Sequence, residues 1–123
     1  RRIILRAKLT LRRDEPAAIQ HRMGEYVAHR RATQPFESSA GSVFKNPPGD
    51  AAGRLIERAG LKGTTVGGAM ISPKHANFII NRDDATAADV MALIRLARDR
   101  VREQFGVDLE MEVLRLGEWG DEP

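Results

Sequence analysis

The stretch from Ser38 to Gly49 holds the residues of this chain that are best suited to chemistry. It combines small residues with the hydroxyl of Ser42, the cation of Lys45 and the amide of Asn46. Small residues on a loop let a ligand approach the backbone closely, and the lysine and the asparagine would offer hydrogen-bond donors beside it. From spacing alone, a turn followed by a short strand explains the stretch better than a ligand site does, and both interpretations stay open.

Two further side chains could take part in such a site. His75 could donate or shuttle a proton, although no second histidine stands near it at a spacing typical of metal ligands. Glu112 lies among apolar residues, where an inward-facing carboxylate is costly unless it is paired or functional. The simpler alternatives are a surface histidine and a carboxylate on the solvated face of a strand.

Several common site signatures are missing from the sequence. Ser42 does not stand in the Gly-x-Ser-x-Gly elbow of a hydrolase, and the glycines at 63–68 match neither a dinucleotide-binding nor a Walker motif. The chain has no cysteine, which excludes disulfides, thiolate chemistry and cysteine-ligated zinc. We therefore predict no metal site, and the glycines give only weak support to a phosphate-binding loop.

The elements that would position these side chains include three helices. Asp14 precedes apolar residues at three- and four-residue spacing, which predicts a helix over 15–30. Asp50 could cap a short helix over 51–59. The clearest helical pattern covers 86–105, where apolar residues recur three or four positions apart and charged residues occupy the other positions.

Extended segments lie between and around these helices. Alternating apolar and polar residues predict a strand over 2–12, and shorter patterns predict strands near 66–71, 78–80 and 109–114. The strands near 66–71 and 78–80 should form a hairpin-like pair, whereas the segment from residue 32 to 41 reads as a loop. The predicted fold class is therefore α+β, with helices packed on a small, mostly antiparallel sheet.

Length and composition fit one soluble domain. The chain has 123 residues, of which 41% are hydrophobic and 30% charged, and no apolar run is long enough to cross a bilayer.

Nine of the 20 Lys and Arg residues but only three of the 17 Asp and Glu residues lie within residues 1–31. A basic end could bind nucleic acid or a phosphorylated small molecule. We expect a cytoplasmic protein, and the start at an arginine within a predicted strand suggests a piece of a longer one.

Five ordered motifs give the chain a resemblance to a known family, the UDP-N-acetylenolpyruvoylglucosamine reductases, or MurB flavoenzymes, of peptidoglycan precursor synthesis. The absence of a tyrosine-bearing insertion before the last motifs resembles the shorter, second type of this family. The motifs lie between about residues 31 and 117 and are Ser39–Pro47, Ala52–Ile56 with Ala59–Gly63, Gly67–Ala69, Lys74–Phe78 and Leu109–Val113.

The resemblance covers the C-terminal substrate-binding domain of that family. It implies that residues 1–12 are the end of a preceding flavin domain or a linking strand, that 13–117 form the substrate-binding domain and that 118–123 are a tail. It also implies that FAD, held by the flavin domain, takes hydride from NADPH and passes it to the enolpyruvyl group of UDP-N-acetylglucosamine enolpyruvate. The flavin domain of the same polypeptide would be the partner of this chain, and neither nucleic acid nor a membrane would be one. This chain alone should be inactive.

The same resemblance implies roles for individual residues. Ser42 matches the serine that protonates the carbon next to the substrate carboxylate, and Glu112 matches a glutamate that assists that step. Asn46 matches a residue that holds the nucleotide part of the substrate, and Lys45 belongs to the same motif in a supporting role. Arg31 stands at the position of a basic residue that binds the diphosphate, and Arg30 is the alternative to it. His75 stands at the position where the other family type has a glutamine near the substrate, so it is a further substrate-binding candidate.

Two other hypotheses remain on the residues alone. An independent basic module could bind nucleic acid through its arginine-rich first quarter, with steep salt dependence. An interaction domain would bind neither nucleic acid nor a nucleotide sugar.

Overall fold

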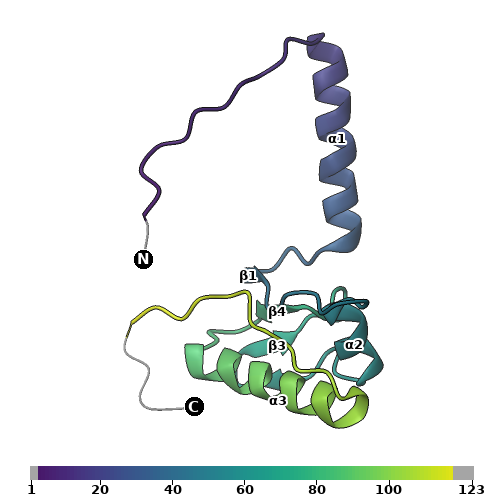
Figure 1. Ribbon diagram of the computed structural model, residues 1–123, viewed down its shortest axis with the longest axis vertical. Coiled ribbons are helices and arrows are strands. Elements are labelled where there is room, and N and C mark those ends of the chain that lie inside the picture. The colour runs from purple at the N-terminus through teal and green to yellow at the C-terminus, as the bar shows by residue number, and fades with distance from the viewer. Residues whose placement is uncertain (1–2, 118–123) are drawn as a thin grey trace. The chain divides into compact units, whose positions relative to one another are not determined.

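The computed structural model describes residues 3–117, so the predicted tail at 118–123 lies outside the described residues. The chain forms two compact units, one ending at Ala32 and the other beginning at Thr33. The first unit contains an extended segment followed by the helix α1, Pro16–Thr33 (Figure 1). The second contains all the strands and the other two helices.

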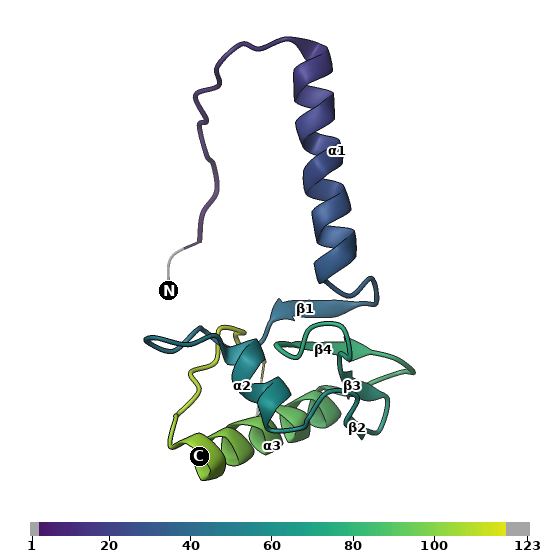
Figure 2. The ribbon, with the colours of Figure 1, turned by 90° about the vertical axis from the view of Figure 1, so that its right-hand side faces the viewer.

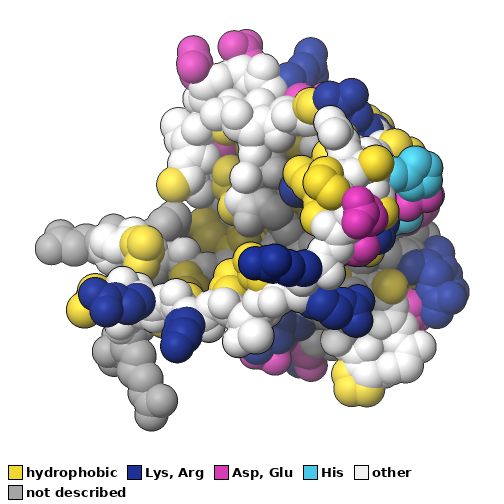
Figure 3. Space-filling view, turned by 90° about the horizontal axis from the view of Figure 1, so that it is seen from above, with side chains coloured by type: hydrophobic (Ala, Val, Ile, Leu, Met, Phe, Trp, Pro, Cys, Tyr) yellow, Lys and Arg dark blue, Asp and Glu magenta, His cyan; other side chains and the backbone are white. Residues whose placement is uncertain are grey.

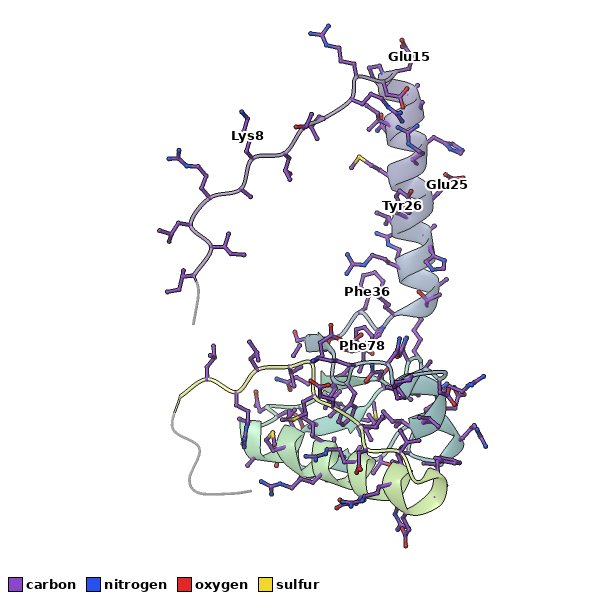
Figure 4. All side chains as sticks on the ribbon, viewed as in Figure 1. Lys8, Glu15, Glu25, Tyr26, Phe36 and Phe78 are labelled. Carbon is purple, nitrogen blue, oxygen red and sulfur yellow. The ribbon has the colours of Figure 1, made fainter. Side chains whose placement is uncertain are left out.

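The strand predicted over 2–12 is wrong for the described part of that segment. Residues 3–12 have no regular secondary structure and are exposed, and Figure 4 shows the side chain of Lys8 pointing outward from it. A strand is held by hydrogen bonds to a neighbour, and nothing within residues 3–117 pairs with this segment. The alternating pattern therefore does not form a strand among the described residues, and its apolar side chains, such as Leu5 and Leu11, are exposed.

The helix predicted over 15–30 is confirmed, with bounds at Pro16 and Thr33. The side chain of Asp14 accepts a hydrogen bond from the backbone N–H of Glu15 at 2.9 Å, close to where the helix begins. The apolar side chains on this helix are exposed, including Met23 at 61% and Tyr26 at 69%, which Figure 4 labels. The helical pattern in the first unit is thus correct although no core forms around it.

The second unit is built on a four-stranded antiparallel sheet in the order β1-β4-β3-β2 (Figure 2). The strands are β1 Ser39–Ser42, β2 Thr65–Val66, β3 Ala69–Ile71 and β4 Phe78–Asn81. The predicted hairpin-like pair is confirmed, since β3 and β4 pair with Met70 opposite Ile80. The loop predicted from residue 32 to 41 is too long, because β1 begins within it.

The glycine-rich turn between β2 and β3 lies tightly against other parts of the second unit. A Cβ atom on Gly67 would lie 2.5 Å from the carboxylate of Asp89, and one on Gly68 would lie 1.8 Å from the backbone oxygen of Asp83. Such distances leave no room for a side chain. The two glycines therefore allow the chain to pack against itself at this turn.

Helix α3, Ala87–Phe105, lies against strands β2 and β3 and confirms the helix predicted over 86–105 (Figure 2). Thr86 and Asp89 form a reciprocal capping box, in which Thr86 N–H donates to the Asp89 carboxylate and Asp89 N–H donates to Thr86 Oγ1. Hydrogen bonding of the carboxylate by the Thr86 backbone N–H is the largest effect that holds the pKa of Asp89 below its usual value. Gly106 ends the helix in the left-handed conformation, with φ of 67°. Helix and sheet together confirm the α+β class.

Helix α2, Ala52–Arg58, matches the helix predicted over 51–59, but its predicted cap is wrong. Asp50 does not cap it, because the N-cap position is Ala51, and the Asp50 carboxylate binds the backbone N–H of Ala51 and the guanidinium of Arg54 instead. The first-turn N–H of Ala52 is bound by the side-chain oxygen of Asn46 at 3.0 Å.

The strand predicted over 109–114 is reduced to a single antiparallel bridge between Phe44 and Met111. The backbone N–H of Lys45 donates to Glu110 O at 2.9 Å, and that of Glu112 donates to Val43 O at 2.8 Å. The segment meets only the short piece of chain that follows β1, so the pairing cannot extend into a regular ladder.

Apolar side chains between α2, α3 and the sheet form the core of the second unit. The largest fully buried apolar side chains are those of Phe44, Ile56, Ile71, Ile80, Leu93, Ile94 and Val101.

None of the helices formed by residues 3–117 combines the length and the apolar character that a bilayer span requires.

Candidate functional site

One open pocket of about 490 Å³ in the second unit brings four of the predicted site residues together. Its walls come from the end of β1, from α2, from the turn before β4 and from the segment that bridges to Phe44. The four residues that it gathers are Ser42, Asn46, His75 and Glu112.

Ser42 ends strand β1, and the chain around it is fixed on both sides. It lies opposite Phe78 of β4, with an irregularity in the pairing between Ser39 and Ser42 that includes Gly41 at φ of 82°. Two residues after Ser42, the side chain of Phe44 is 2% exposed and anchors the chain in the core. The serine hydroxyl is therefore presented at the pocket by a rigid edge strand.

Asn77 contributes to this rigidity, and sequence reasoning gave it no role. Its side chain is buried and forms two hydrogen bonds with the backbone of Phe44: Oδ1 accepts from N–H at 2.9 Å, and Nδ2 donates to the carbonyl at 2.8 Å. The backbone oxygen of Asn77 accepts from Val43 N–H at 2.9 Å. In the sequence Asn77 stands in the turn before an apolar strand, and that position alone does not signal these contacts.

Glu112 reaches the pocket from the far end of the chain. Its backbone is tied to Val43, next to Ser42, and its side chain is exposed at the pocket. The desolvation cost expected for a carboxylate among apolar residues therefore does not arise. The bridge to Phe44 is what brings this glutamate and the serine to the same cavity.

The pocket wall carries charged residues that sequence reasoning did not select: Arg54, Glu57, Lys62 and Lys74. Lys62 pairs with Glu57 at 2.7 Å, and Arg54 pairs with Asp50 at 2.7 Å. The Arg54 hydrogen bond holds the pKa of Asp50 below its usual value. These cations give the pocket a means of binding a ligand with dense negative charge, because a phosphate can replace an exposed carboxylate partner.

Two predicted substrate-binding residues, Lys45 and Arg31, are not among the residues that line this pocket. The side chain of Lys45 forms an ion pair with Glu110 and does not line this pocket. Arg31 lies in the last turn of α1 beside Arg30, in the first unit, whereas the pocket belongs to the second. Within residues 3–117, no group of three or more histidine, aspartate or glutamate side chains is placed to hold a metal ion.

The comparisons with known proteins agree on one family. Residues 34–116 match the family model described as UDP-N-acetylenolpyruvoylglucosamine reductase, C-terminal domain. The reductase of Chloroflexus aggregans is 57% identical over 111 residues, which is 90% of this chain and 37% of that protein. The reductase of Anaeromyxobacter dehalogenans is 54% identical over 118 residues, 95% of this chain and 36% of that one.

A solved structure gives the same result. The crystal structure of UDP-N-acetylenolpyruvylglucosamine reductase (MurB) from Thermus caldophilus matches with a TM-score of 0.70 and 47% identity, covering 88% of this chain and 39% of that chain. The chain thus spans a little over a third of the length of the relatives that it matches.

Proposed function

The chain belongs to the family defined by the C-terminal domain of UDP-N-acetylenolpyruvoylglucosamine reductase, and from this we propose that it is the substrate-binding part of a longer reductase of that kind. The substrate would be UDP-N-acetylglucosamine enolpyruvate, whose double bond is reduced to a lactyl ether for peptidoglycan synthesis in the cytoplasm. The observation that carries the proposal is the single pocket that collects Ser42, Asn46, His75 and Glu112.

In the proposed reaction, the rest of the polypeptide would hold FAD, whose chemistry would be the transfer of hydride from NADPH to the enolpyruvyl group. We assign no FAD-binding residue to this chain, because the resemblance gives the cofactor to the preceding domain and the glycine turn at Gly67 and Gly68 lies against Asp89 and Asp83. No step of the flavin chemistry is therefore assigned to this chain, and alone it is expected to have no reductase activity.

The role proposed for this chain's own residues is proton delivery. Addition of hydride to one carbon of the double bond leaves negative charge on the carbon next to the carboxylate, and that carbon must receive a proton. Ser42 would donate this proton from the end of β1, and Glu112, at the same pocket, would assist the transfer or stabilise the enol.

The remaining residues would hold the nucleotide part of the substrate. Asn46 and His75 line the pocket and offer hydrogen bonds, and Arg31, with Arg30 as the alternative, would bind the diphosphate, as the resemblance to the family implies. Lys45 would support this arrangement through its position beside Asn46, while its own side chain pairs with Glu110.

A nucleic-acid-binding module is the competing proposal, and the basic first quarter of the sequence is what favours it. On the face drawn in Figure 3, Lys and Arg side chains as well as Asp and Glu side chains are exposed. Nucleic acid binding requires cations gathered along one surface, so that its phosphates can be neutralised together.

Titration of the complete polypeptide with each ligand tests the proposed function. We expect saturable binding of UDP-N-acetylglucosamine enolpyruvate that depends on Asn46, because the amide lies at the pocket and contributes roughly one hydrogen bond, worth about 1 kcal/mol. Duplex DNA at the same protein concentration is the comparison. DNA binding that weakens steeply with salt, without binding of the nucleotide sugar, would contradict the proposal.

A further inference from the structure

The imidazole of His75 is held on three sides. Its Nδ1 accepts a hydrogen bond from the backbone N–H of Asn77 at 3.2 Å. Its ring meets the ring of Phe78 edge to face, with centroids 4.8 Å apart. On the third side lies the first turn of α2, where Gly53 faces the ring. These contacts leave the imidazole little freedom to rotate.

The third contact depends on the absence of a side chain. A Cβ atom on Gly53 would lie 3.1 Å from His75 Cε1, which is tighter than an ordinary van der Waals contact, and at ordinary contact distances of 3.4 Å from His75 Nδ1 and 3.5 Å from Asn77 Cβ. Gly53 is in helical conformation within α2, without a positive φ. Nothing in its backbone geometry needs glycine, and glycine is a poor helix former compared with alanine. The feature that requires glycine here is the room taken by the imidazole ring.

The contacts also decide which ring nitrogen can serve a ligand. A neutral imidazole donates from one nitrogen and accepts at the other. Because Nδ1 accepts from Asn77, the hydrogen is on Nε2, and His75 lines the pocket. His75 is thereby prepared as a donor for an acceptor atom of the ligand, such as a phosphate or carbonyl oxygen.

We propose that Gly53 is a positioning residue, which acts through His75 by letting the imidazole lie against α2 in the orientation that binds the nucleotide sugar. The inference rests on the proposed function, since it assigns His75 to that ligand. A methyl group at position 53 would push the ring away by a few tenths of an ångström and turn Nε2 from its acceptor. The fold itself should tolerate or prefer alanine there.

The test is a double-mutant cycle in the complete polypeptide with FAD bound. The dissociation constant of UDP-N-acetylglucosamine enolpyruvate is measured without NADPH for the wild type, Gly53→Ala, His75→Ala and the double variant. We expect Gly53→Ala to weaken binding about three- to ten-fold, which is the contribution of a single hydrogen bond. In the His75→Ala background the same change should have no further effect, because the ring that it displaces is gone.

The matched control is Gly24→Ala, which places the same methyl group in helix α1, where a Cβ atom would meet nothing within 4 Å. It should leave the dissociation constant unchanged. The urea midpoint of unfolding is recorded for every variant. If Gly53→Ala lowers that midpoint, the same substitution should not lower it in the His75→Ala background, because the clash is with the imidazole.

Three results would overturn the inference. Unchanged binding in Gly53→Ala, with weakened binding in His75→Ala, would show that Gly53 does not position the ring while the proposed role of His75 stands. Equal weakening by Gly53→Ala in both backgrounds would show that it acts on something other than His75. Unchanged binding in His75→Ala would remove His75 from the proposed substrate site, and the inference would fall with it.

Discussion

Ser42→Ala in the complete polypeptide is expected to leave the reduction of FAD by NADPH unchanged and to slow the reduction of the enolpyruvyl substrate about 10²–10⁴-fold. The reason is that only the second half-reaction needs a proton at the carbon next to the carboxylate. Ser42 lies at the pocket on a fixed strand, so no neighbouring hydroxyl of that strand can replace it. Rapid-mixing measurements of flavin absorbance separate the two half-reactions.

The matched control for this variant is Ser39→Ala. Ser39 is the other serine of β1, it is exposed, and it does not line the same pocket. Its removal should leave both half-reactions near the wild-type rates. Equal slowing of both half-reactions by Ser42→Ala would contradict a role in proton donation, and so would equal effects of the two serine variants.

Glu112→Gln is expected to slow the same second half-reaction by about 10²-fold or more, again without effect on reduction of the flavin. The substitution keeps the shape of the side chain and removes its charge. Glu112 lies at the pocket with Ser42, and its backbone is tied to Val43. A carboxylate in this place can accept a proton and pass it on, whereas an amide cannot.

Glu110→Gln provides the comparison for the glutamate. Glu110 is two residues earlier in the same segment, and its carboxylate pairs with Lys45 outside the pocket. Neutralising it should change enolpyruvyl reduction little. If Glu110→Gln and Glu112→Gln slow the reaction equally, general weakening of the segment would explain both, and a specific role for Glu112 would be wrong.

The parts of the fold that the sequence predicts well are those decided by local interactions. Helix α3 has its capping box, its apolar stripe and its terminal glycine within one continuous segment. The pair β3 and β4 is similarly local, because a short turn joins two strongly apolar strands. In both cases the residues that decide the structure are close together in sequence.

The wrong predictions concern interactions between distant residues. Residues 3–12 have the pattern of a strand, but a strand needs a partner, and none is present within residues 3–117. Asp50 looks like the cap of α2 from its position, yet Asn46 binds the first-turn N–H instead. The segment around Met111 forms one bridge rather than a strand, because the chain that it meets is short.

The residues of the candidate site were likewise predicted only in part. The resemblance to the reductase family selected Ser42, Asn46, His75 and Glu112, and the fold places all four at one pocket. Their spacing alone could not have predicted this, since Glu112 is 70 residues from Ser42 and arrives through the bridge to Phe44. Roles that depend on backbone contacts in three dimensions were missed in the sequence.

Gly53 and Asn77 are two residues whose roles were missed in this way. Gly53 reads in the sequence as an ordinary residue of a short helix, and only the position of the His75 ring explains it. Asn77 reads as a turn residue, whereas its side chain binds both the backbone N–H and the backbone carbonyl of Phe44. Neither residue carries a chemical group that would mark it as catalytic.

A structure of the complete polypeptide with UDP-N-acetylglucosamine enolpyruvate bound tests the central claim most directly. We expect the enolpyruvyl carbon next to the carboxylate to lie within reach of Ser42 Oγ, and the nucleotide sugar to contact Asn46 and His75 in the pocket described above. A substrate bound elsewhere, with Ser42 and Glu112 far from its enolpyruvyl group, would contradict the assignment of this pocket as the place where the proton is delivered.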